Sequence, residues 1–238
     1  MSPVETRVPR STTRRVLLLL SGTTLMGASI GLLVRAQSGL LPLDVLHSAV
    51  AARTGWTLGV AIIVTQALLL ALYIPLRIKP GLGTVTAFVV PGIGADITLF
   101  LLPAVTGTAS RIALLVAGAC GFSLGVALYL DASLGVLPRD GIIEALARRR
   151  GYSPALLRVL TDLLSLTAGW LAIGPVLAVH TGLVGVASLG LALVVGPLVG
   201  FLRAPNPLQY RPLRSRTTRS DPAEQPCPDG ESPSEAPR

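Results

Sequence analysis

Six long apolar segments dominate this chain of 238 residues and limit what it can fold into. Each is about 20 residues long, which is the length that an α-helix needs to cross the hydrocarbon core of a bilayer. Inside a bilayer, a helix satisfies every backbone hydrogen-bonding group within its own segment. We therefore predict an all-α polytopic membrane protein with about six transmembrane helices, at residues 16–36, 57–77, 84–102, 111–131, 154–173 and 181–202.

Composition and charge agree with a membrane protein. Charged residues make up 13% of the chain and hydrophobic residues 51%, whereas a soluble domain carries roughly 25% charged residues. The net charge of +8 would suggest nucleic acid as the partner of a soluble protein. Beside transmembrane helices, arginines instead set the orientation and meet anionic lipid, so we expect the lipid bilayer as a partner and no nucleic acid.

One stretch of the chain occurs twice, as residues 37–57 and 133–153. At an offset of 96 positions, eight residues are identical within a window of 17, which indicates an internal repeat. Both copies contain a Pro-x-Asp motif, which ends at Asp44 in the first copy and at Asp140 in the second. Because proline and an acidic side chain are favoured in the first turn of a helix, the motifs predict short helices after the first and fourth spans.

Three spans per repeat place the two short helices on opposite sides of the membrane. The transmembrane domain, residues 16–202, then consists of two inverted repeats, 16–102 and 111–202. This plan is common among secondary transporters. Each short helix either lies at the membrane surface or dips into the protein and lines a cavity, and the sequence is compatible with both.

Lysine and arginine flank the spans unevenly. With the amino terminus in the cytoplasm, the cytoplasmic flanks carry 15 of these residues and the external flanks carry three. This bias predicts a multi-pass protein of a bacterial cytoplasmic (inner) membrane with both termini cytoplasmic. Residues 1–15 form a cytoplasmic N-terminal segment, and residues 203–238, with eight prolines, are predicted to be a disordered cytoplasmic tail.

Polar residues within or beside the spans are the candidates for a functional site. A charged side chain in the middle of a span costs about 2.5–3.5 kcal/mol, so it usually faces a partner or a wet cavity. Gln66 and Asp162 occupy matching positions of the two repeats, and we expect them to face each other inside the protein. Arg158 lies one helical turn before Asp162 and is placed to neutralise it. The residues predicted near a central path for a solute or ion are Asp44, Gln66, Asp96, Asp140, Arg158 and Asp162.

We expect no enzyme, and no catalytic residue, metal or cofactor. Gly-x-Ser-x-Gly occurs twice, around Ser29 and Ser123, but a hydrolase nucleophile needs a strand-to-helix turn. These motifs lie in apolar spans, where small residues let helices pack closely. Cys120 and Cys227 lack metal-ligand spacing, and His47 is expected to be an ordinary residue at the membrane boundary.

Three segments carry a resemblance to a known family. Residues 39–47 (GLLPLDVLH), 79–84 (KPGLGT) and 134–141 (LGVLPRDG) look like the YczE-type bacterial membrane proteins related to YitT. The resemblance extends over about residues 14–203. It implies a multi-span protein of the cytoplasmic membrane and leaves the activity open.

Two functions are compatible with these observations. The repeat and the polar residues within the spans favour a transporter or permease for a small solute. The alternative is a non-transporting membrane partner, or scaffold, that supports another complex through its cytoplasmic loop and tail. Neither a particular solute, nor a coupling ion, nor an oligomeric state follows from the residues.

The charge bias predicts which stretches a membrane-impermeant thiol reagent reaches in intact cells. Single cysteines introduced within residues 41–55 should be labelled from outside, whereas those within 139–151 should react only after the membrane is opened. The background for these variants has Cys120 and Cys227 replaced by serine. Labelling of the second stretch without the first would show that the orientation is the reverse.

Overall fold

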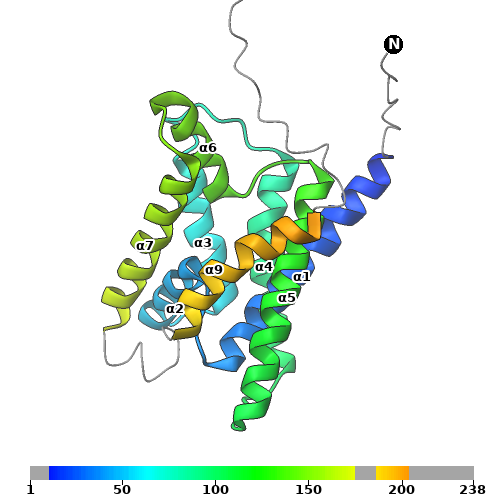
Figure 1. Ribbon diagram of the computed structural model, residues 1–238, viewed down its shortest axis with the longest axis vertical. Coiled ribbons are helices and arrows are strands. Elements are labelled where there is room, and N and C mark those ends of the chain that lie inside the picture. The colour runs from blue at the N-terminus through cyan, green and yellow to red at the C-terminus, as the bar shows by residue number, and fades with distance from the viewer. Residues whose placement is uncertain (1–10, 175–185, 204–238) are drawn as a thin grey trace, which may run out of the picture. The chain divides into compact units, whose positions relative to one another are not determined.

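The computed structural model describes residues 11–174 and 186–203. Those ranges contain eight α-helices and no strand, so the prediction of an all-α fold is confirmed for them. Most of the predicted N-terminal segment and nearly all of the predicted tail lie outside them. The helices are α1 (Thr12–Ala36), α2 (Pro42–Thr54), α3 (Leu58–Ala71), α4 (Leu82–Leu101), α5 (Thr108–Ala132), α6 (Pro138–Arg150), α7 (Pro154–Ile173) and α9 (Val186–Arg203) (Figure 1).

Several of these helices are candidates for membrane spans. By length and composition, α1, α4, α5 and α7 can each cross a bilayer. Helices α2 and α3, which meet at an angle of 115°, make a fifth candidate if they count as one broken span. The described residues therefore support a multi-span membrane protein, with fewer complete spans than the six that the sequence predicts.

The second predicted span, residues 57–77, differs most from the structure. Helix α3 stops at Ala71 after 14 residues, so it is about 21 Å long and falls short of a hydrocarbon core of about 30 Å. Pro75 is the reason, because it has no N–H for the Ala71 carbonyl and its ring clashes with that oxygen. The Ile74 N–H donates to the Ala71 carbonyl instead, at 3.2 Å, and the chain continues in turns.

The helices keep the offset of 96 positions that the sequence shows. Helices α1 and α5 begin and end 96 positions apart, as do α2 and α6, and α3 and α7 begin 96 positions apart. The residues that end these helices match as well. Gln37 and Ser133 both have a left-handed backbone (φ 48° and 52°), as do Gly55 and Gly151 (φ 74° and 70°). The first half (α1–α4) and the second half (α5–α9) therefore share one order of helices.

Helices α1 and α5 lie antiparallel, and their ends make matching contacts. Arg15, near the start of α1, donates to the carbonyl oxygens of Ala132 (2.9 Å) and Ser133 (2.6 Å) at the end of α5. Arg111, which is 96 positions after Arg15, donates to the Gln37 side chain at the end of α1 (2.9 Å). In Figure 1 the start of α1 lies beside the end of α5 near the top of the view. In each half, an arginine near the start of one long helix therefore binds the residue that follows the other long helix, through its backbone in Ser133 and through its side chain in Gln37.

The short helices α2 and α6 also make matching contacts with the opposite half. Arg53, in the last turn of α2, donates to the Ala172 carbonyl in α7. Arg149, in the last turn of α6, donates to the Leu76 carbonyl after α3. Arg53 and Arg149 are 96 positions apart, and so are Leu76 and Ala172. Each half is therefore fastened to the other through its short helix.

Glycine lets α1 approach its neighbours closely. A Cβ atom at Gly22 would lie 2.7 Å from the Gly125 carbonyl oxygen of α5, and one at Gly27 would lie 2.5 Å from the Pro91 carbonyl oxygen of α4. Helix backbones this close need a residue without a side chain. The serine hydroxyls of both Gly-x-Ser-x-Gly motifs donate to carbonyls one turn earlier in their own helices. The motifs therefore serve helix packing, as predicted.

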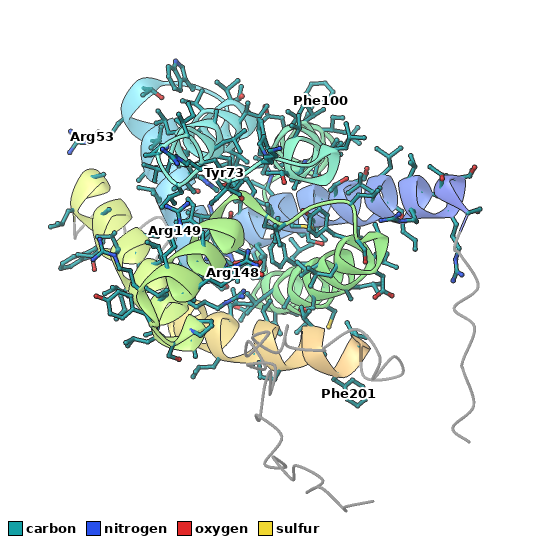
Figure 2. The ribbon with its side chains drawn as sticks, turned by 90° about the horizontal axis from the view of Figure 1, so that it is seen from above. Arg53, Tyr73, Phe100, Arg148, Arg149 and Phe201 are labelled. Atoms are coloured by element: carbon teal, nitrogen blue, oxygen red, sulfur yellow. The ribbon has the colours of Figure 1, made fainter. Side chains whose placement is uncertain are left out.

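Large apolar side chains cover the outside of the helices. Phe100 in α4 and Phe201 in α9 are exposed, and Figure 2 shows them pointing outward on opposite sides, whereas Tyr73 lies among the helices. Soluble proteins rarely leave much contiguous apolar surface uncovered. A surface of this kind is expected where a bilayer contacts the protein.

The α1–α5 contact predicts that Gly22 does not tolerate even alanine. Gly22→Ala should lower the melting temperature of the purified protein in detergent, because overpacking of this kind costs about 1–3 kcal/mol. Gly190→Ala is the matched control, since a Cβ atom at Gly190 meets nothing within 4 Å. That control should keep or raise the melting temperature, because alanine favours the helix. Equal melting temperatures for the two variants would contradict the close contact.

Candidate functional site

A partly open cavity of about 110 Å³ lies between the helices. All eight helices of the described ranges contribute to its wall. Met26 of α1, Pro91 of α4, Phe122 of α5 and Val195 of α9 each line the cavity from near the middle of their helix. The cavity therefore lies at mid-depth between the two ends of these helices.

The cavity also lies where the two halves meet. In three pairs of lining residues, the second half has a charged side chain where the first half has an uncharged one. These pairs, each 96 positions apart, are Leu43/Arg139, Ile62/Arg158 and Gln66/Asp162. The two sides of the cavity thus differ in charge although the helices that carry them repeat.

Two arginines and two aspartates form a network on the second-half side of the cavity. Arg139 Nη1 donates to Asp162 Oδ1 at 2.5 Å, and Arg139 Nε lies 3.6 Å from Asp140 Oδ1. Arg158 Nη1 lies 3.7 Å from the same oxygen of Asp140. Arg139 and both aspartates are partly buried and Arg158 is half exposed, and the two positive and two negative charges balance one another. The network also fastens α6 to α7.

This network corrects the predicted partner of Asp162. The sequence predicts Arg158 as that partner, but the structure places Arg139 against Asp162 and Arg158 beside Asp140. The reason is the packing of α6 on α7, which brings Arg139, in the first turn of α6, to Asp162, two turns into α7. Sequence reasoning missed Arg139, and the signal that identifies it is the change from leucine at position 43 to arginine at the matching position of the repeat.

Asp44 and His47 form a separate pair on the first-half side. His47 Nδ1 lies 3.2 Å from Asp44 Oδ1, one turn apart on α2. Both line the cavity, and the residues are 1% (His47) and 5% (Asp44) exposed. The burial of His47 corrects its expected place at the membrane boundary. Since α2 also buries Val45 and Ala49, its packing supports the alternative in which the first Pro-x-Asp helix lines a cavity.

Gln66 and Asp162 both face the cavity but do not bind each other. Asp162 binds Arg139, whereas Gln66 Oε1 has no hydrogen-bond partner among the residues that the structure describes. Gln66 is 8% exposed, so this oxygen is buried. Both residues therefore line the cavity, as their matching positions in the repeat predict, but Asp162 is paired with Arg139 and not with Gln66.

The remaining predicted residues, Asp96 and Asp140, are not part of the cavity wall. Asp96 Oδ1 accepts from the Gly59 N–H at 2.7 Å. Gly59 lies in the first turn of α3, where backbone N–H groups have no partner within the helix. Asp96 therefore caps α3 and fastens it to α4, which corrects its predicted place near a solute path. Asp140 acts through Arg139 and Arg158, both of which line the cavity.

A second hollow, of about 340 Å³, lies between the turn that follows α3 and the end of α6. Arg77 and Lys79 line it from the turn. Arg148 and Arg149, which Figure 2 labels, line it from α6. Four basic side chains around one hollow suit anionic groups such as lipid phosphates. This basic groove is separate from the central cavity in its lining residues.

The chemistry that the central cavity supports is the binding of a small polar molecule. It combines an ion-paired side, a buried Asp–His pair and apolar walls, which is the usual make-up of a ligand pocket. Within the described ranges, no group of three or more His, Cys, Asp or Glu side chains is placed to hold a metal ion.

Two similar proteins cover most of this chain. One is an uncharacterized protein of Haemophilus influenzae, 27% identical over 188 residues that cover 79% of this chain and 83% of that protein. Another is the uncharacterized membrane protein YczE of Bacillus subtilis, 26% identical over 172 residues that cover 69% of this chain and 80% of that protein. The predicted resemblance to YczE-type proteins is therefore confirmed. No solved structure matches the chain.

The match to a family extends across both halves. Residues 13–204 match DUF6198, a family of unknown function. This range includes every described helix apart from the first residue of α1. The chain is thus a membrane protein that belongs to the DUF6198 family.

Proposed function

We propose that this protein is a transporter, and not an enzyme, for a small polar solute that binds in the central cavity. The observation that carries the proposal is the position of the cavity, which lies at mid-depth between two repeated halves and is lined by polar side chains from both. Inverted-repeat transporters bind their solutes at this place. Ionisable side chains at such depth are costly, so they mark solute or ion paths.

We also propose that the two halves are inverted repeats related by a pseudo-two-fold axis in the membrane plane. The antiparallel packing of α1 and α5 and the exchanged arginine contacts support this relation. A further pair of hydrogen bonds links the last helix of each half to the segment that precedes the short helix of the other half. Thr84 Oγ1 donates to the Val136 carbonyl (2.9 Å), and the Leu40 N–H donates to Ser188 Oγ (3.1 Å), with positions 40 and 136 again 96 apart. Six crossings result if α9 and the residues around α3 each complete one.

A cytoplasmic membrane location with both termini inside completes the proposal. The basic groove of Arg77, Lys79, Arg148 and Arg149 then faces the cytoplasm, which is the side where arginine and lysine gather.

The same groove favours a second candidate function, that of a non-transporting membrane partner. A basic surface on the cytoplasmic side suits an acidic segment of another protein. In this case the central network would only fasten the halves, and no solute would cross the membrane. A solute screen with vesicles that contain the purified protein separates the two candidates, because only a transporter changes the solutes that the vesicles retain.

Asp162→Asn should slow solute movement at least about tenfold, which corresponds to about 1.4 kcal/mol, because it removes the anion that holds Arg139 at the cavity wall. The rate is measured as solute uptake into the vesicles. Glu144→Gln is the matched control, since it removes a carboxylate from an exposed pair with Arg148 at 3.4 Å, outside the cavity. That variant should transport like the unmodified protein.

The double variant Arg139→Gln/Asp162→Asn separates a structural from a functional role. It replaces the ion pair with two neutral groups that still hydrogen-bond, so it should recover the melting temperature of the unmodified protein but not its transport. Unchanged transport in Asp162→Asn, or full transport in the double variant, would refute a role of this pair in solute movement.

A further inference from the structure

The polar atoms on the first-half side of the cavity are acceptors without donors. Asp44 Oδ2 and Gln66 Oε1 are buried and have no hydrogen-bond partner within the described part of the chain. Both residues are more than nine-tenths buried, and both line the cavity. A buried acceptor without a donor has lost its hydrogen bonds to water and gained none in return, which destabilises the fold, and more so when the acceptor is charged. Such atoms at a cavity wall point to a ligand that donates to them.

A third polar atom on the same side is also buried without a partner. His47 Nε2 has no hydrogen-bond partner among the described residues, and it is an acceptor when His47 is neutral and donates from Nδ1 to Asp44. The first-half side therefore presents a carboxylate and an amide acceptor, with an imidazole nitrogen beside them.

The arginines of the cavity do not neutralise this side. Arg139 binds Asp162 and Arg158 lies beside Asp140, so their charges are already balanced. In the described ranges, the ion pair found for Asp44 is the one with His47. With a neutral His47, the Asp44 carboxylate gives the first-half side a negative charge, while the second-half side is neutral as a whole.

We infer that the solute is a small organic cation whose ammonium N–H groups donate to Asp44 Oδ2 and Gln66 Oε1. This inference rests on the proposed transport function. The volume of about 110 Å³ is smaller than the roughly 150 Å³ cavity that holds a benzene molecule, so the cation carries only a few carbon atoms. Met26, Ile30 and Phe122 cover that apolar part, which a bare inorganic cation does not have.

Titration calorimetry of the purified full-length protein in detergent tests this chemistry. The probes are ethylammonium chloride, tetramethylammonium chloride, which has no N–H donor, sodium chloride, and sodium propionate as an anion of similar size. We expect saturable binding of ethylammonium alone. Asp44→Asn should weaken it at least about tenfold, and Gln66→Glu should strengthen it several-fold by adding a second carboxylate. Glu144→Gln should leave the affinity unchanged.

Each other outcome has a distinct meaning. If propionate, sodium or tetramethylammonium binds in preference to ethylammonium, the assignment of an ammonium solute is wrong. Transport of an anion in the vesicles would also overturn this assignment, but it would support the transport function. Ethylammonium binding that depends on Asp44, without solute movement in vesicles, would refute the transport function alone. If Asp44→Asn does not fold, the affinity for ethylammonium is measured in Gln66→Glu and Gln66→Leu instead. An affinity that is unchanged in both variants would overturn the inference.

Discussion

The close contact between α1 and α5 is the interaction on which the rest of the structure depends. Gly22 and Gly125 bring the two backbones together at a distance that no side chain permits. Helix α4 then packs along α1, and α9 packs along α5. Near this contact, Met26 and Phe122 occupy matching positions and line the cavity. The antiparallel pair of α1 and α5 therefore holds the two halves together. It also sets the depth at which the central cavity lies between them.

A repeated backbone does not require repeated chemistry. If both halves carried the same side chains, the two cavity sides would present the same charges to each other across a small space. Instead, Arg139 and Asp162 replace Leu43 and Gln66 in the second half, and each new charge meets one of opposite sign. Asp44 keeps a carboxylate on the other side. The divergence of a few positions thus gives one side on which arginines and aspartates are paired, and another side on which a carboxylate lies beside a histidine.

The features that were predictable from the sequence are those that depend on local pattern. The all-α fold follows from segment length, and the bounds of α2 and α6 follow from proline at the start and a left-handed glycine after the end. Features that depend on packing between distant segments were not predictable. Asp96 caps α3 because α4 happens to lie beside its first turn, and Arg139 reaches Asp162 because α6 packs on α7. The spacing of residues along α7 predicted Arg158 as the partner of Asp162, because spacing within one helix does not show which residues of a neighbouring helix lie close.

The exchanged arginine contacts also bear on how such a chain can arise. Arg53 reaches from the first half to the second, and Arg149 reaches back at the matching place. Each half therefore leaves uncovered the surface that the other half covers, so half of the chain is an incomplete fold. If the two halves are inverted repeats, as proposed, an ancestral chain of half this length needs a second copy of itself in the opposite orientation to cover that surface. Joining the two copies in one chain frees each of them to change its side of the cavity alone.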